Sequence, residues 1–119
     1  MKKKIICFDL DNTIFKTHKN HYKNSRPIKK NLKLVNSLYD DGYYIKIFTS
    51  RYMGRAKENK KIAESMGFDS TKKQLKYWGL KYNELIFGKP SFHLIVDDKS
   101  LFFKKNWTEE IKKKLKKIK

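Results

Sequence analysis

Two carboxylates follow the first apolar run of the chain. Asp9 and Asp11 stand one residue apart, directly after Ile5-Ile6-Cys7-Phe8. This β-rich run predicts a buried strand over residues 4–8. Charged groups at the end of a buried strand are costly unless a partner compensates them. The chain must therefore fold so that both carboxylates meet a partner at this strand end.

A second pair of acids repeats the arrangement. Asp97 and Asp98 follow His93-Leu94-Ile95-Val96, and this run predicts another strand over residues 92–96. Acids are otherwise scarce, because the chain has only 12 Asp and Glu against 30 Lys and Arg. Paired acids at two strand ends favour a cation held by oxygen ligands.

Length and composition predict one folded domain over residues 1–119. A hydrophobic content of 39% with 14% aromatic residues is typical of a globular chain. No apolar run approaches the roughly 20 residues that span a bilayer, so we expect no membrane span. The single cysteine, Cys7, excludes an internal disulfide and favours a cytoplasmic location. We interpret Cys7 as a small buried residue of the first strand.

The net charge of +18 indicates attraction to polyanions. The positive charge is almost all lysine, with Arg26, Arg51 and Arg55 as the arginines, and it is spread along the whole chain. Specific nucleic-acid readers favour arginine and clustered charge. We therefore expect non-specific attraction to polyanions, with most lysines on a solvated surface.

Strand and helix patterns alternate along the chain. Strands are predicted over residues 4–8, 43–48, 84–87 and 92–96, and helices from Pro27 to Asp41-Gly42, over 55–66, over 71–78 and from Thr108. Gly67 is the predicted stop of the second helix, and residues 16–26 read as a loop. Strands separated by helices indicate βαβ units, a parallel sheet and an α/β fold.

Each predicted strand ends in a polar group of the kind that phosphate chemistry uses. These groups are Asp9 and Asp11, then Thr49 and Ser50, then Lys89, then Asp97 and Asp98. Ligands of open α/β sheets bind outside the carboxyl ends of the strands. Taken singly, each motif has an ordinary alternative as a turn, a helix cap or an exposed loop residue. Their coincidence on four strands favours a common phosphate site.

In this order the motifs resemble those of the haloacid dehalogenase (HAD) superfamily of phosphohydrolases. That family carries an Asp-x-Asp-x-Thr signature, a Ser or Thr, a Lys and a terminal acid pair. Three stretches resemble more closely the small capsule-biosynthesis-type HAD proteins of bacteria: Phe48-Thr49-Ser50-Arg51, Tyr82-Asn83-Glu84-Leu85-Ile86-Phe87-Gly88-Lys89-Pro90 and Ile95-Val96-Asp97-Asp98-Lys99. The resemblance implies a minimal three-layer, Rossmann-like fold around a central parallel sheet. The gaps between the motifs are too short for a cap domain.

The resemblance also implies catalytic roles, and these roles fit the chemistry of the residues. Asp9 would attack phosphorus and form an aspartyl-phosphate. Asp11 would protonate the leaving alcohol and then activate water. Lys89 would neutralise the nucleophile and the phosphoryl group. Mg²⁺ would take the Asp9 carboxylate, the Asp11 backbone carbonyl and either Asp97 or Asp98, of which we favour Asp98.

The remaining candidates would bind the substrate. Thr49 would hold a phosphoryl oxygen through its hydroxyl, assisted by the amides of Ser50, Leu10 and Asn12. Arg51 is expected either to reach a second anionic or hydroxyl group of the substrate or to form a surface salt bridge.

We therefore expect a Mg²⁺-dependent phosphomonoester hydrolase acting on a phosphorylated sugar or a related cell-surface precursor. One alternative is a polynucleotide or nucleotide phosphatase, which the charge and an open site favour. Another is a non-catalytic module that binds anions or nucleic acid. A site without a cap would suit a large substrate or a homo-oligomer. The lysine-rich C-terminal helix is expected to pack on the domain or on a neighbouring subunit, with a membrane-surface or polyanion-binding helix as the alternative.

Overall fold

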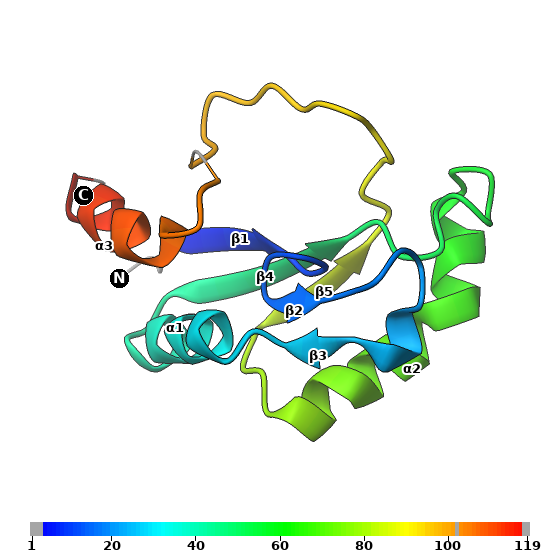
Figure 1. Cartoon of the computed structure of the whole chain (residues 1–119), viewed down its shortest axis with the longest axis horizontal. Coiled ribbons are helices and arrows are strands. Elements are labelled where there is room, and N and C mark those ends of the chain that lie inside the picture. The colour runs from blue at the N-terminus through cyan, green and yellow to red at the C-terminus, as the bar shows by residue number, and fades with distance from the viewer. Residues whose placement is uncertain (1–3, 102, 118–119) are drawn as a thin grey trace.

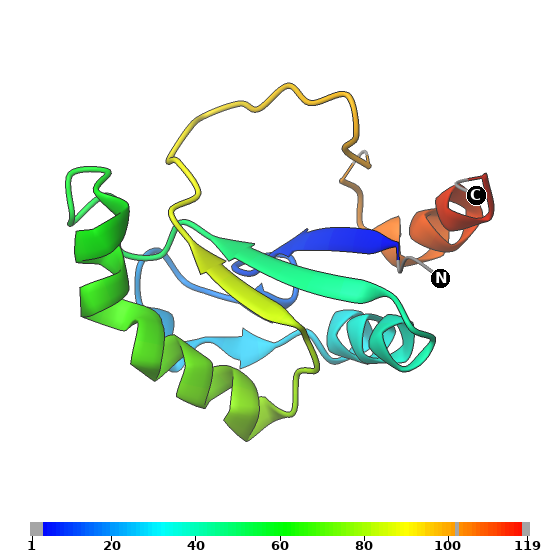
Figure 2. The ribbon, with the colours of Figure 1, turned by 180° about the vertical axis from the view of Figure 1, so that it is seen from behind.

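Three parallel strands form the centre of the molecule. The computed structural model describes residues 4–101 and 103–117. Its main sheet has the order β1-β4-β5 and consists of β1 (Ile5–Asp9), β4 (Tyr44–Thr49) and β5 (Glu84–Phe87). Both pairings are parallel, and Figure 2 shows the three strands side by side. The structure confirms the first three predicted strands to within one residue at most bounds.

Helices connect these strands, as the alternation of patterns predicts. Helix α1 (Lys29–Asp40) joins β1 to β4, and α2 (Lys60–Trp78) joins β4 to β5 (Figure 1). Helix α3 (Trp107–Lys117) is the last element and begins close to the predicted Thr108. The molecule is thus an α/β protein with a central parallel sheet flanked by helices, in a Rossmann-like arrangement.

The segment after β1 is more ordered than the loop that its composition predicts. Strands β2 (Phe15–Lys16) and β3 (Arg26–Pro27) form a short antiparallel pair, and the 3₁₀ helix η1 (Tyr22–Asn24) lies between them. Helix α2 packs against η1 as well as against β5. This small unit therefore joins the carboxyl end of β1 to the middle of α2.

One face of the sheet carries the hydrophobic core. Strand β4 alternates buried and half-buried residues, so that Ile45 and Ile47 point into the core. Helix residues of the same cluster are Leu34, Val35, Leu38, Leu75, Trp107 and Ile111. On the opposite face, Ile5 and Cys7 are exposed. The part of the chain described here therefore lacks the helical layer that a three-layer arrangement would place on that face.

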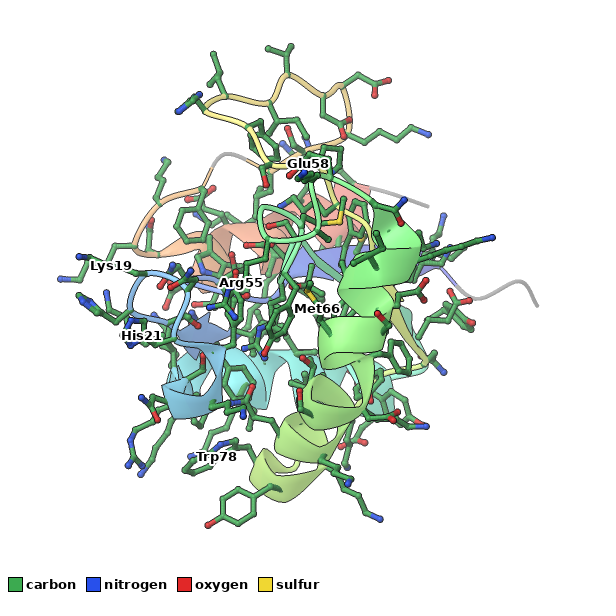
Figure 3. The ribbon with its side chains drawn as sticks, turned by 90° about the vertical axis from the view of Figure 1, so that its right-hand side faces the viewer. Lys19, His21, Arg55, Glu58, Met66 and Trp78 are labelled. Carbon is green, nitrogen blue, oxygen red and sulfur yellow. The ribbon has the colours of Figure 1, made fainter. Side chains whose placement is uncertain are left out.

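Helix α2 differs from the two short helices predicted for this region. It begins at Lys60, where the Asn59 side chain accepts the Ile62 N–H at 3.1 Å, and it passes through Gly67 without a break. Figure 3 follows it as one helix from Met66 to Trp78. The earlier start predicted at residue 55 is wrong, because the chain turns through left-handed conformations just before Asn59. Gly67 continues the helix because the ring of Tyr52 packs where a side chain would stand.

The fourth predicted strand is also wrong. Residues 92–96 have no regular structure, and Leu94 and Val96 are 82% and 91% exposed. This stretch belongs to a long arch that runs from the end of β5 to α3 and stands clear of the sheet in Figures 1 and 3. In the described part of the chain, β1 consequently remains an edge strand. No helix among the described residues is long and apolar enough to cross a membrane.

Candidate active site

The carboxylate of Asp9 lies between a cation and a hydroxyl at the end of β1. Lys89 Nζ donates to Asp9 Oδ1 at 3.0 Å, and Thr13 Oγ1 donates to Asp9 Oδ2 at 3.1 Å. The Asp9 side chain is 33% exposed and that of Lys89 is 18% exposed. The pair is therefore sheltered but open to a ligand from solvent.

The parallel sheet brings Lys89 to Asp9 across 80 residues of sequence. Strands β4 and β5 stay paired up to Thr49 and Phe87, and the Lys89 N–H then donates to the Thr49 carbonyl at 3.2 Å. Gly88, between Phe87 and Lys89, has a φ of 101°, a conformation that favours glycine. This turn directs Lys89 towards the carboxyl end of β1.

Asp11 is held by Arg51 in a two-pronged ion pair. Arg51 Nη2 donates to Asp11 Oδ1 at 2.8 Å, and Nε donates to Oδ1 at 3.1 Å and to Oδ2 at 3.0 Å. Thr17 Oγ1 donates to the same Oδ1 at 2.6 Å. Oδ1 therefore accepts three of these hydrogen bonds and Oδ2 accepts one.

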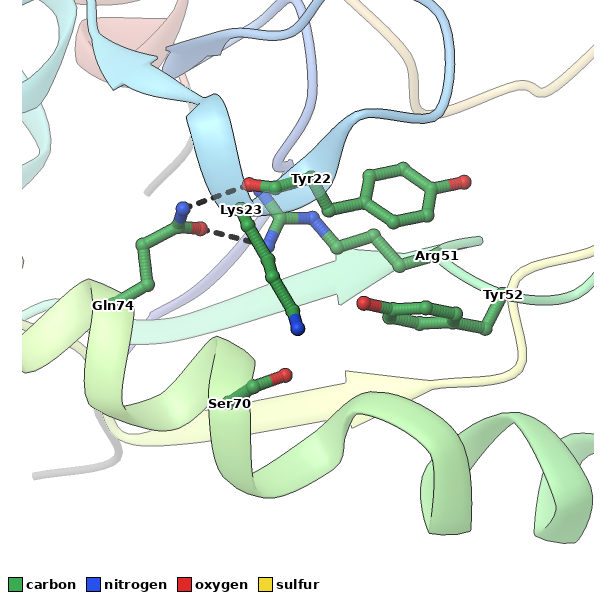
Figure 4. A pocket seen from close by; sticks show the side chains of 6 residues that line it. All are labelled: Tyr22, Lys23, Arg51, Tyr52, Ser70 and Gln74. Carbon is green, nitrogen blue, oxygen red and sulfur yellow. Dashed lines mark hydrogen bonds between the residues drawn. The ribbon is translucent and has the colours of Figure 1, made fainter.

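Arg51 is itself enclosed by hydrogen-bond acceptors. Its side chain is 1% exposed, and its Nη1 donates to Gln74 Oε1 at 2.7 Å and to Thr71 Oγ1 at 3.3 Å. Its Nη2 also donates to Ser25 Oγ at 3.3 Å. The Tyr22 ring lies 5.2 Å from the guanidinium carbon, and Figure 4 shows Arg51 between Tyr22 and Gln74.

These contacts correct the surface salt bridge considered for Arg51. Its ion pair with Asp11 is made inside the fold, where the Arg51 side chain is 1% exposed, and its other described guanidinium contacts are also within the fold. Arg51 instead fixes the position of Asp11.

The second predicted motif lies at the end of β4 beside this ion pair. Thr49 is fully buried, and its Oγ1 accepts the Arg51 N–H at 3.1 Å. Ser50 is half-buried at the same turn. Thr49 therefore supports the turn that carries Arg51 in this conformation.

The turn after β1 uses one of the backbone amides expected to bind phosphate, that of Asn12. The Asn12 N–H donates to the Phe15 carbonyl, and Asn12 Oδ1 accepts the Thr17 N–H at 3.1 Å. Leu10 is fully buried, and its carbonyl accepts N–H groups of the following turn. The Asn12 amide is thus committed to the fold, which differs from its expected role. The turn aims Asp9 at Lys89 and Asp11 at Arg51.

The structure leaves the terminal acid pair apart from this site. Asp97 and Asp98 are exposed, and Asp97 Oδ1 accepts the Lys99 N–H at 2.9 Å, so that Asp97 acts as a turn residue. Among the described residues, no three His, Cys, Asp or Glu side chains form a group that could hold a metal ion. The predicted Mg²⁺ ligands are therefore not assembled in this conformation, because the strand that would carry the second pair is not formed.

Cys7 adds no nucleophile to the site. Burial raises the pKa of its thiol above the ordinary value, and the charge of nearby Asp9 adds to this effect. A raised pKa keeps the thiol protonated at neutral pH, and the thiolate is the reactive form. Cys7 lies in β1 as predicted, but its predicted burial is wrong, because it points to the exposed face of the sheet.

Several residues around Asp11 have no distinguishing sequence signal. Thr17, Ser25, Thr71 and Gln74 are separated by up to 57 residues from one another, and only the packing of α2 against η1 joins them. The side chains of these four residues are ordinary surface types in the sequence, so tertiary structure alone identifies them. Thr13, which donates to Asp9, differs from them because it completes the Asp-x-Asp-x-Thr signature.

Comparison with known proteins bears on the fold. No protein-family model matches the chain, and no curated protein sequence matches it. A crystal structure of a structural-genomics target from Vibrio cholerae is similar, with a TM-score of 0.77 over 94% of this chain and 98% of that chain, at 20% sequence identity. At this identity the likeness shows a shared fold alone. The chain therefore has an α/β architecture that a solved bacterial protein shares over nearly its whole length.

Proposed function

We propose that this protein is a Mg²⁺-dependent phosphomonoester hydrolase of the capless HAD type, similar to the small capsule-biosynthesis-type enzymes. Its substrate would be a phosphorylated sugar or a related cell-surface precursor. One observation carries the proposal: Asp9 lies between Lys89 Nζ at 3.0 Å and Thr13 Oγ1 at 3.1 Å, where the parallel strands end. A carboxylate that is ion-paired yet partly exposed at the carboxyl end of a parallel sheet suits attack on a phosphoryl group.

Asp9 is the proposed nucleophile. One of its carboxylate oxygens bonds to phosphorus while the bond from phosphorus to the ester oxygen breaks, and the alcohol leaves with a proton. Water then attacks phosphorus, and the bond to Asp9 breaks to release phosphate. Lys89 is close enough to offset the negative charge that builds up when the carboxylate meets the anionic phosphoryl group.

Asp11 is the proposed acid and base. It would protonate the leaving oxygen and then take a proton from the attacking water. Its Oδ1 is engaged by Arg51 and Thr17, whereas Oδ2 accepts one hydrogen bond, from Arg51 Nε at 3.0 Å. We infer that Oδ2 is the oxygen that carries the proton.

Magnesium dependence requires a change from the conformation described above. The exposed pair Asp97 and Asp98 lies in the arch, and the acids of the described residues form no group that could hold a metal ion, so the donors do not form an Mg²⁺ site as they stand. We propose that Asp98, or Asp97, approaches Asp9 when residues 92–98 move towards the open edge of β1. When bound, Mg²⁺ would supply positive charge to the phosphoryl oxygens.

Hydrolysis of p-nitrophenyl phosphate tests this proposal. We expect turnover with Mg²⁺, loss of turnover with EDTA, and a loss of roughly 100-fold or more in Asp9→Asn, because the nucleophile is removed. Asp69→Asn is the control, since Asp69 is an exposed carboxylate on α2. Mass spectrometry after rapid acid quench should find one phosphoryl group on the wild type and none on Asp9→Asn. Undiminished turnover by Asp9→Asn would rule out the covalent route.

A polynucleotide or nucleotide phosphatase is the second candidate, because basic side chains line a groove near Arg51. Rates on a panel of sugar phosphates and on 3′- and 5′-phosphorylated oligonucleotides would separate the two substrates. A non-catalytic anion-binding or nucleic-acid-binding module would hydrolyse none of them. A cytoplasmic location and a homo-oligomer that shields the open site belong to the same proposal.

A further inference from the structure

A groove of about 650 Å³ lies between the β3 region and the last turns of α2. Its walls come from two segments, residues 23–26 on one side and residues 70–78 of α2 on the other. The lining residues are Lys23, Asn24, Ser25, Arg26, Ser70, Lys73, Gln74, Tyr77 and Trp78. The α2 residues follow a spacing of three and four, so they form one face of the helix. Lys23, Ser70 and Gln74 also line the small pocket beside Arg51 that Figure 4 shows.

The groove is positively charged, and no acidic side chain among its lining residues offsets this charge. Lys23, Arg26 and Lys73 line it, and none of its nine lining residues is acidic. All three cations are exposed, and none forms an ion pair with another described residue. The groove therefore suits an anionic ligand.

An aromatic side chain lies beside these cations. Tyr77 is 80% exposed, and its ring meets that of Trp78 edge to face, with centroids 5.0 Å apart. The faces of an exposed ring that is held by a second ring can accept a planar group by stacking. Tyr77 thus presents an exposed ring face next to the three cations of the groove.

The floor of the groove is polar and fixed. Ser25 is 3% exposed and shares hydrogen bonds with Thr17 and Arg51. Gln74 accepts from Arg51 and donates through Nε2 to the Tyr22 carbonyl at 2.8 Å. The packing of η1 on α2 holds both walls in position. The groove is therefore part of the rigid structure around Asp11.

We propose that this groove binds a segment of single-stranded nucleic acid. Phosphates would pair with Lys23, Arg26 and Lys73, and an unstacked base would lie on Tyr77. Cationic grooves with exposed aromatic rings bind single strands in this way, largely without regard to sequence. A lipid surface would need an apolar face to insert, whereas seven of the nine lining residues of the groove are polar or charged. The proposal does not depend on phosphatase activity.

Binding of a fluorescently labelled oligonucleotide of about ten nucleotides tests the proposal. Anisotropy titrations at several salt concentrations would compare Lys73→Glu with Lys61→Glu, an exposed lysine on α2 outside the groove. We expect Lys73→Glu to weaken binding several-fold more than Lys61→Glu does. Neutral Lys73→Gln should lower the dependence of log affinity on log salt by about 0.7, since one phosphate contact is lost.

A second pair of variants tests whether a base stacks on the Tyr77 ring. Tyr77→Ala should weaken single-strand binding by roughly 5- to 100-fold, while Tyr39→Ala, which removes an exposed ring on α1, should leave it unchanged. Because Tyr77 is so exposed, its truncation should preserve the circular dichroism and the Tm. A duplex of the same length should bind more weakly than the single strand, since its bases are already stacked.

Three results would overturn the proposal. Equal losses in Lys73→Glu and Lys61→Glu would mean that diffuse charge causes binding. Unchanged binding by a folded Tyr77→Ala variant would exclude stacking. Tighter binding to anionic phospholipid vesicles than to the oligonucleotide, weakened by the same substitutions, would assign the groove to a membrane surface. All these readouts are independent of turnover, so they stand apart from the test of the proposed hydrolase.

Discussion

The conformation of Asp11 depends on a buried arginine. A buried guanidinium is stable only when its N–H groups have hydrogen-bond acceptors and an opposite charge lies beside it. The Arg51 guanidinium donates to side chains that satisfy both needs: Asp11, Ser25, Thr71 and Gln74. Removing one partner of such a pair usually costs more than an exposed ion pair contributes. Asp11 keeps 19% of its side chain exposed, so part of this cost is relieved by solvent.

We predict that Arg51→Lys destabilises the fold by about 3 kcal/mol, because an ammonium cannot replace the planar fork that meets Asp11 and Gln74 together. Urea unfolding would measure the loss. Arg26→Lys is the matched control, since Arg26 is exposed and should change stability by less than about 0.5 kcal/mol. If Asp11 acts as proposed, Arg51→Lys should also lower kcat for p-nitrophenyl phosphate. An unfolding midpoint equal to that of the wild type would contradict the role assigned to Arg51.

The sequence predicts the pairing of Asp9 with Lys89 better than it predicts the role of Arg51. Two groups that follow parallel strands meet at the carboxyl ends of those strands, so the contact of 3.0 Å between Asp9 and Lys89 follows from the order of the motifs. Whether Arg51 points outwards or inwards depends on acceptors from η1 and α2. No local pattern reveals those acceptors, because they come together only on folding.

Helix α2 shows why a glycine is an uncertain stop signal. Gly67 has no side chain to pack, and the pattern therefore predicts a helix end there. In the structure the missing side chain instead makes room for the ring of Tyr52, and the helix continues for 11 residues to Trp78. That extension carries Thr71 and Gln74 to Arg51. Tertiary packing thus outweighs the local preference and completes the site.

Gly67→Ala tests this packing. Alanine favours a helix over glycine by about 1 kcal/mol, yet a Cβ at this position would overlap the Tyr52 ring. We therefore expect a net loss of stability of about 1–3 kcal/mol on urea unfolding. Gly54→Ala is the control, because a Cβ there meets nothing within 4 Å. A stabilised Gly67→Ala variant would mean that Tyr52 does not occupy this place in solution.

Among the described residues the main sheet has two unpaired edges, at β1 and at β5. The parallel order β1-β4-β5 follows from the alternation of strands and helices, and the similar bacterial structure has the same fold. The apolar run over 92–96 predicts a strand but has no partner here, because periodicity does not specify which edge a strand joins. Exposed apolar side chains such as Val96 thus lie in the same molecule as an open edge at β1.

The proposed approach of Asp98 to Asp9 predicts a response to Mg²⁺. Hydrogen exchange at amides 92–96 should slow by at least about tenfold when Mg²⁺ is added, because ordering the segment protects its N–H groups. Asp98→Asn should abolish the slowing if Asp98 is the ligand, and Asp97→Asn should do so if Asp97 is. Asp41→Asn, an exposed acid at the end of α1, should behave as the wild type. Unchanged exchange in the wild type at saturating Mg²⁺ would exclude this movement.

Gln74 belongs both to the groove and to the hydrogen bonds that hold Arg51. A bound strand that draws the Gln74 amide towards itself would alter the Arg51 environment, and a ligand at Asp11 that shifts Arg51 would alter the groove. Thermodynamic linkage would make such an effect reciprocal, so that each ligand changes the affinity of the other by the same factor. Through one amide side chain, two surfaces of the molecule would then respond to each other.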